Sequence, residues 1–136
     1  MAVEDTERTL NFFHRVFGFE SKPGEEFVSN PLVQNGVGAP GAQFRNSRAT
    51  LSGGTVYWEI VESRNIDRKP FRLRISDPRA PAFSLRVRDL DAVMMRVRVE
   101  GGSVVSRIGQ LGHKPGSIFI RDPNGFLLKL IQSQLD

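Results

Sequence analysis

The sequence predicts an α+β fold made of two βαβββ modules. Two stretches with helical periodicity are each followed by strand-like runs, so the order of elements repeats along the chain. A short motif repeats with them, because Val3-x-Asp5 recurs as Val87-x-Asp89, 84 residues later. A Pro-Asn-Gly turn at 123–125 then leads into a closing apolar strand. Internal repetition of this kind indicates a duplicated structural unit.

The first helix is predicted over residues 5–17, with Asp5 or Thr6 as its N-cap. Its apolar side chains follow helical spacing, as Leu10, Phe13 and Phe17 show, and Gly18 ends it. The chain begins at Met1, so we expect the first module to lack most of its opening strand.

The rest of the first half contains two predicted strands. Residues 20–41 are rich in proline and glycine and are predicted to be irregular, with at most a helical turn at 31–34. Residues 42–51 have the composition of a strand, and residues 56–61 form a stronger one with a single acid, Glu59.

The second half repeats this order. A polar connection over 63–80 leads to a predicted strand at 83–87 and a helix from Asp89 to about residue 100. Two strands (103–108 and 117–120), a loop (109–116) and the closing strand (126–131) complete it. The sequence therefore predicts one domain with module 1 at about 1–62, a linker at about 63–80 and module 2 at about 81–133.

Composition excludes several classes of protein. The 136 residues are 39% hydrophobic and 25% charged, as in an ordinary globular domain. The absence of cysteine excludes a disulfide framework and thiol catalysis. No apolar run approaches the roughly 18 residues of a membrane span, and the first residues do not resemble a signal peptide, so we expect a cytoplasmic protein. The net charge is +4, but the arginines are interleaved with acids, which argues against nucleic-acid binding.

The residues also carry a family resemblance. The run VEDTERTLNFF at 3–13, followed by Gly18-Phe19-Glu20, resembles the first module of the vicinal oxygen chelate superfamily. VRDLD at 87–91 and DPNGFLL at 122–128 resemble its second module. That superfamily includes glyoxalase I, bleomycin-resistance proteins, fosfomycin-resistance enzymes and extradiol dioxygenases. The resemblance implies that the two modules form a curved mixed sheet and that the chain is a homodimer, because a second chain often completes the cup of that sheet.

The resemblance also implies a metal site, which this sequence does not complete. In metal-dependent members, the first and last strands of each module supply one ligand each, usually His or Gln, Glu, His and Glu. The last-strand positions fall on Glu59, which matches, and on Lys129, 70 residues later, which does not. The first-strand position of module 2 falls on Ala82, and its counterpart lies before Met1. We therefore expect no metal cofactor, with Lys129 in the place of the ion and paired with Glu59 within the chain or across a dimer.

Strand alternation places several of these residues on one face of the sheet. That face is expected to form a mixed cup with an apolar floor, suited to a small molecule. The alternative is that Glu59 and Lys129 are merely solvated strand positions. The predicted ligand-binding residues are Tyr57, Glu59, Val61, Ser84, Arg86, Leu127, Lys129 and His113, the last from a loop that could cover the cup.

Two classes of function remain open. The first is a metal-free protein of the bleomycin-resistance type that binds a small, partly apolar molecule. The second is a lyase, isomerase or dioxygenase-type enzyme in which Glu59 is the catalytic residue, with or without a divalent metal. Bound metal, or turnover of a 2-oxo hemithioacetal, would distinguish the second from the first. The pattern at Gly36-x-Gly38-x-x-Gly41 matches a dinucleotide fingerprint, but its context excludes one, since Pro40 interrupts it and no helix is expected after it.

Overall fold

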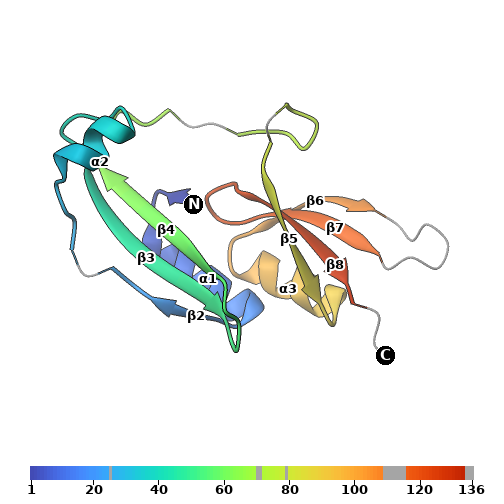
Figure 1. The fold of residues 1–136 in the computed structure, drawn as a ribbon. Helices are drawn as coiled ribbons and strands as arrows, with labels where there is room; N and C mark the ends of the chain where they lie inside the picture. Colours follow the sequence, from blue (N-terminus) through green and yellow to red (C-terminus); the bar gives the residue numbers. More distant parts are fainter. Residues whose placement is uncertain (25, 70–71, 79, 109–115, 134–136) are drawn as a thin grey trace. The chain divides into compact units, whose positions relative to one another are not determined.

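The computed structural model describes residues 1–24, 26–69, 72–78, 80–108 and 116–133 (Figure 1). The chain divides into two compact units, Met1–Pro70 and Phe71–Asp136, each with its own sheet. None of the described helices is long and apolar enough to cross a membrane.

Within its described residues, the first unit holds a four-stranded sheet in the order β1-β4-β3-β2. β1 runs parallel to β4, and the other neighbours are antiparallel. One face packs on α1 through an aromatic cluster in which the Phe13 ring lies 5.0 Å from that of Trp58. The elements are β1 (Ala2–Val3), α1 (Thr6–Phe17), β2 (Phe19–Lys22), α2 (Pro31–Gly36), β3 (Gln43–Leu51) and β4 (Tyr57–Arg64).

The described part of the second unit repeats this topology, with strands in the order β5-β8-β7-β6. β5 is parallel to β8, and the remaining neighbours are antiparallel. Its elements are β5 (Ala82–Val87), α3 (Leu90–Val99), β6 (Ser103–Ile108), β7 (Ser117–Arg121) and β8 (Leu127–Gln132). Its core includes fully buried side chains from α3, β7 and β8, namely Val97, Ile118, Ile120, Leu128 and Leu130.

The strand register confirms the internal repeat. Val3 pairs with Glu62 in the first unit, and Val87 pairs with Gln132 in the second. These pairs are related by the same offsets of 84 and 70 residues that the sequence motifs show. The predicted two-module βαβββ fold is therefore confirmed.

Each module ties its last strand to the start of its helix in the same way. A Glu62 carboxylate oxygen accepts a hydrogen bond from the backbone N–H of Thr6 at 3.0 Å. At the equivalent position, the Gln132 side-chain oxygen accepts from the N–H of Leu90 at 2.8 Å. Both bonds satisfy a backbone donor that the first turn of a helix leaves without an intrahelical partner.

The predicted helices and most strands are confirmed. Asp5 caps α1, and Gly18 ends it with a φ of 75°. Several boundaries differ by one residue, and three differ by more. β2 lies partly within a segment expected to be irregular, because only four residues form it before Pro23. The helical turn expected at 31–34 extends to Gly36 as α2. β4 continues to Arg64, so the connection between the modules begins two residues later than predicted.

The turn at 122–126 depends on a buried aspartate. Asp122 is almost fully buried, and its carboxylate accepts from the backbone N–H groups of Asn124 at 2.9 Å and Phe126 at 2.7 Å. Gly125 has a φ of 85°, a conformation that favours glycine. The predicted turn is therefore held by its own side chain and leads directly into β8.

The surroundings of Glu62 shift the ionisation of its carboxyl group. Burial by itself would raise the pKa of Glu62. Hydrogen bonds from the Arg45 guanidinium, at 2.7 Å, and from Thr6 outweigh that effect and hold the pKa below its usual value. The ionised carboxylate therefore stabilises the folded first unit.

We predict that Glu62→Gln lowers the free energy of unfolding at neutral pH by about 1–2 kcal/mol, because a charged hydrogen-bond acceptor is lost. A depressed pKa stabilises the fold above the unfolded-state value, and this contribution disappears as the pH falls through the folded-state pKa. The difference in the free energy of unfolding between the unmodified protein and Glu62→Gln should thus vanish in acid, below the ordinary glutamate pKa of 4.5. Urea titrations across pH measure this, with Glu20→Gln, on exposed β2, as the control. A difference that persists unchanged into acid would contradict it.

Candidate functional site

The first unit presents one face of its sheet to its helix and leaves the other open. Ser47, Ala49 and Ile60 alternate towards α1 and are buried. The intervening residues lie on the open face, where Arg48 is directly opposite Glu59 and Asn46 is opposite Val61. The sheet thus brings polar and apolar side chains from neighbouring strands together on one surface.

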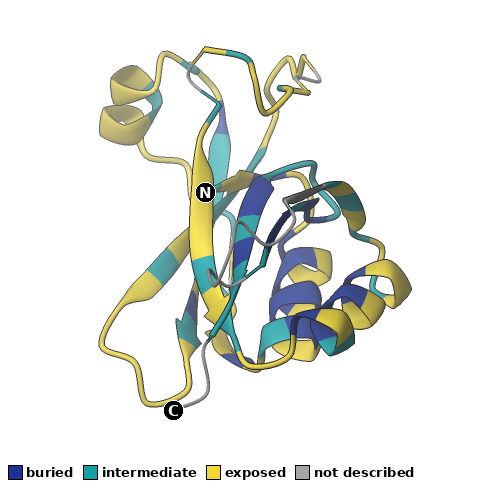
Figure 2. Cartoon of the chain, turned by 90° about the vertical axis from the view of Figure 1, so that its right-hand side faces the viewer, coloured by how far each residue is buried: buried dark blue, intermediate teal, exposed yellow. Residues whose placement is uncertain are grey.

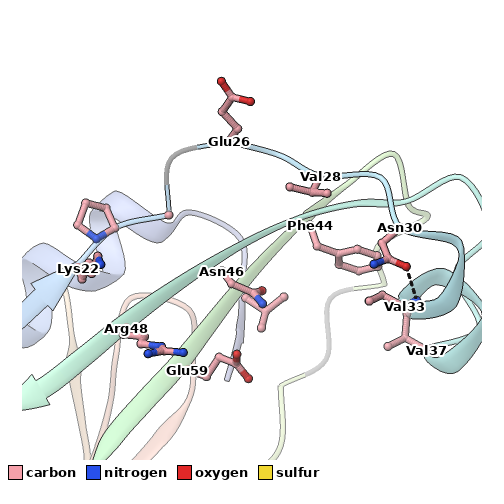
Figure 3. Close-up of a pocket in the computed structure, with 13 residues that line it drawn as sticks. Lys22, Glu26, Val28, Asn30, Val33, Val37, Phe44, Asn46, Arg48 and Glu59 are labelled. Atoms are coloured by element: carbon pink, nitrogen blue, oxygen red, sulfur yellow. Dashed lines mark hydrogen bonds between the residues drawn. The ribbon is translucent and has the colours of Figure 1, made fainter.

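A cavity of about 910 Å³ lies on this open face and is formed entirely by the first unit (Figure 3). Its size is within the range of small-molecule sites. Apolar side chains of the 28–37 segment, β3 and β4 form one part of the wall, and polar side chains of β2, β3 and β4 form the other. The apolar residues are Val28, Val33, Val37, Phe44 and Val61, and the main polar ones are Lys22, Asn46, Arg48 and Glu59.

The segment after β2 forms one wall because it runs close along β3. The Gly24 N–H donates to the Ser47 hydroxyl at 2.8 Å, and Val28 pairs with Phe44 through two backbone hydrogen bonds. A Cβ at position 24 would lie only 2.2 Å from the Asn46 carbonyl oxygen. Glycine is therefore required here by close backbone approach rather than by a positive φ.

An aromatic side chain fixes the same segment. The Phe27 ring lies beneath two guanidinium groups, with Arg64 4.1 Å and Arg45 5.1 Å from its centroid. Arg45 is itself anchored by its ion pair with Glu62. Cation–π contacts of this kind stabilise the ring against the end of the sheet.

α2 supplies the apolar part of the wall. The Asn30 side chain caps the helix by accepting from the N–H groups of Leu32 and Val33. The Gln34 amide donates to the Ala42 carbonyl at 2.8 Å, which ties the helix to the start of β3. No residue of α2 is buried, and Figure 2 shows the helix exposed along nearly its whole length. Val33 on this helix and Val37 at its C-cap therefore line the cavity without belonging to a packed core.

The charged groups of the cavity form a row across three strands. Lys22 on β2 is the direct partner of Arg48 on β3, which is the direct partner of Glu59 on β4. The Arg48 guanidinium lies 4.6 Å above the Tyr57 ring. This cation–π contact holds the guanidinium over the open face.

The predicted site residues divide between the two units. Glu59 and Val61 line the cavity, and Tyr57 adjoins it beneath Arg48. In the second unit, Ser84 lies directly opposite Lys129, and Arg86 lies opposite Ile131.

Two of the predicted residues in the second unit have contacts within their own module. The Lys129 ammonium lies 6.0 Å from the centroid of the Phe119 ring. Leu127 is buried, with only 3% of its surface exposed. His113 lies outside the described residues. The pairing of Glu59 with Lys129 stays a prediction, as the two belong to separate units.

Sequence reasoning missed the β2, β3 and 28–37 side of the cavity. Alternation on β3 would have placed Phe44, Asn46 and Arg48 on one face, but the composition of 42–51 does not reveal which face is buried. Lys22 was missed because its strand was predicted to be irregular. Val33 of α2 and the C-cap Val37 carried no usable signal, since that helix is short and has no buried face.

The donor set does not fit a divalent metal at the position that the resemblance implies. Glu59 offers a carboxylate, but Ala82 offers no donor atom and Lys129 offers a cation. Within the part of the chain that the structure describes, no three His, Cys, Asp or Glu side chains form a group able to hold a metal.

Comparison with known proteins identifies the superfamily to which the chain belongs. The family model for the Glyoxalase/Bleomycin resistance protein/Dioxygenase superfamily matches residues 1–130. The chain belongs to this superfamily. No curated protein matches the sequence.

Solved structures share the fold at low identity. A glyoxalase family protein from Bacillus cereus superposes with a TM-score of 0.77 at 15% identity, covering 97% of this chain and 89% of that one. The fosfomycin resistance protein FosX from Listeria monocytogenes superposes with a TM-score of 0.62 at 15% sequence identity, and the match covers 99% of this chain and 90% of FosX. A mutant of glyoxalase I from Zea mays superposes with a TM-score of 0.63 at 16% sequence identity. The match covers 98% of this chain and 43% of the glyoxalase I chain. Such identities establish the fold alone.

We predict that the purified protein retains less than one metal ion per chain after incubation with Zn, Ni, Mn, Fe, Co or Cu and removal of free ions. The reason is that one carboxylate cannot replace several converging ligands. Elemental analysis measures this directly. One tightly held ion per chain would mean that the assignment to Ala82 and Lys129 is misplaced, or that Glu59 and His113 form a different site.

We predict that Gly24→Ala lowers the free energy of unfolding by about 1–3 kcal/mol, because the added methyl group must displace backbone. The close approach to the Asn46 carbonyl leaves no room for it. Denaturant titration measures the loss, and Gly36→Ala is the matched control, because a Cβ there meets nothing within 4 Å. Equal stability of the two variants would show that Gly24 does not pack against β3.

Proposed function

We propose that this protein binds a small, partly apolar molecule without a metal ion, in the cavity on the open face of the first unit. The observation that carries the proposal is the composition of that cavity. An apolar wall from α2 and Phe44 faces a polar row on β2, β3 and β4, and Glu59 is the single residue of the implied metal set that it contains.

The geometry supports binding in two ways. The volume of about 910 Å³ accommodates a drug-sized molecule with contacts to several strands at once. The valines and Phe44 offer apolar area whose transfer from water stabilises a bound apolar group by about 25 cal/mol per Å² buried. The polar row then determines the orientation of the ligand.

An enzyme is the second candidate, favoured by the position of Glu59 on the cavity wall. A carboxylate there can accept a proton from a bound substrate. Turnover of a 2-oxo hemithioacetal that is lost in Glu59→Gln, while ligand binding persists, would decide for this candidate.

We predict that the neutral apolar dye N-phenyl-1-naphthylamine binds with one site per chain and that Val33→Asp weakens it about tenfold or more. Burying a charge against an apolar ligand is unfavourable. Leu32→Asp is the matched control, since Leu32 is the preceding residue of α2, is 82% exposed and does not line the cavity. Both substitutions place an acid in the first turn of the helix, where it is tolerated.

Dye fluorescence titration gives the affinities, and circular dichroism confirms that both variants fold. Equal affinities for the two variants would place the dye elsewhere and argue against this cavity. No dye binding to the unmodified protein would overturn the proposed function.

A further inference from the structure

We propose that the ligand of this cavity is an amphiphilic organic anion, whose anionic oxygen group is held by Lys22 and Arg48 and whose apolar body lies towards α2. The inference rests on the proposed function and names the chemical class of the ligand. It is carried by the placement of two cations on the sheet and by the distribution of apolar side chains along β3.

The two cations occupy an unfavourable arrangement for an empty sheet. Lys22 and Arg48 are direct cross-strand partners, so their side chains project from the same face of neighbouring antiparallel strands. Like charges in this position destabilise a sheet. An anionic group bound between them removes that repulsion, so a sheet that keeps both cations is suited to binding an anion.

Neighbouring groups adapt the pair to this role. Glu59 lies on the far side of Arg48 and balances at most one of the two positive charges. Figure 3 shows Arg48 and Glu59 on the same side of the strands, whereas Glu26, also a lining residue, points away from them. The Tyr57 ring beneath the guanidinium keeps Arg48 extended over the open face. An arginine held in this way presents several donors to a carboxylate or phosphate.

The apolar end lies at a defined distance from the cations. Phe44, Asn46 and Arg48 are alternate residues of β3 and share the open face. At about 3.3 Å per strand residue, Phe44 is about 13 Å from Arg48 along the strand. In Figure 3 the Phe44 ring lies beside Val33 and Val37, and all three line the cavity. An anion with a medium-length alkyl or aromatic body spans this distance.

The test compares probes that share one alkyl chain and differ in charge: decanoate, decan-1-ol and decyltrimethylammonium. Isothermal titration calorimetry and displacement of N-phenyl-1-naphthylamine give their affinities for the full chain. We expect decanoate to bind about tenfold more tightly than either other probe, as for a hydrogen-bonded charged group. Decyl phosphate is included, and its rank against decanoate distinguishes a phosphate from a carboxylate as the preferred group.

Variants assign the effect to the cation pair. Arg48→Gln and Lys22→Gln should each weaken decanoate about tenfold and leave decan-1-ol unchanged, since only the charged contact is lost. Arg8→Gln, on the exposed face of α1, removes the same charge away from the cavity and should change neither probe. Raising the salt concentration should weaken decanoate binding selectively, because partly exposed charges are screened.

Three results would overturn the inference while leaving the proposed function intact. The first is that the dye binds but decanoate and decan-1-ol bind with equal affinity. The second is a preference for decyltrimethylammonium that Glu59→Gln abolishes, which would identify Glu59 as the charge that selects the ligand. The third is a decanoate preference that survives both Arg48→Gln and Lys22→Gln. Failure of the dye and of all the alkyl probes to bind would overturn the proposed function as well.

Discussion

The constraint on which the rest of the fold depends is a hydrogen bond in each module, donated by a backbone N–H in the first turn of the helix to a side chain on the last strand. The equivalent residues Glu62 and Gln132 accept these bonds from the backbone N–H groups of Thr6 and Leu90, so that the helix, the first strand and the last strand meet at one point.

 The same last-strand residue also pairs with a valine on the first strand of its module. Glu62 pairs with Val3, and Gln132 pairs with Val87. Because strand side chains alternate, fixing one face against the helix leaves the opposite face open. The cavity is a consequence of this arrangement.

The duplicated scaffold carries different chemistry in its two halves. The pair Arg48 and Glu59 on β3 and β4 corresponds, by the offset of 70 residues on the last strand, to Phe119 and Lys129 on β7 and β8. The buried positions between them stay apolar in both modules, as Ile60 and Leu130 show. Packing therefore constrains one face of each sheet, while the open face is free to vary.

Sequence reasoning predicted the parts of the fold that repeat with a strong period. Both helices were predicted because their caps, Asp5 and Asp89, precede residues with helical spacing. β2 and the wall that follows it were not predicted, because Pro23 and Gly24 are typical of a loop. Gly24 instead allows the backbone to approach β3, and that contact is a tertiary feature which local sequence does not contain. Lys22 was missed for the same reason, and Arg48 was missed because the composition of 42–51 does not reveal which face of β3 is buried.

The open face also explains how a member of this superfamily keeps its fold without the ligand set that the resemblance implies. Glu59 and Ala82 are exposed, and Lys129 is only half-buried, so none of them contributes a fully buried side chain to the core. Substitution at such positions costs little stability compared with substitution in the core. Residues at such strand positions can therefore vary in chemistry while the sheet of each unit keeps its packing. In the first unit, the open face carries the row of Lys22, Arg48 and Glu59 beside an apolar wall.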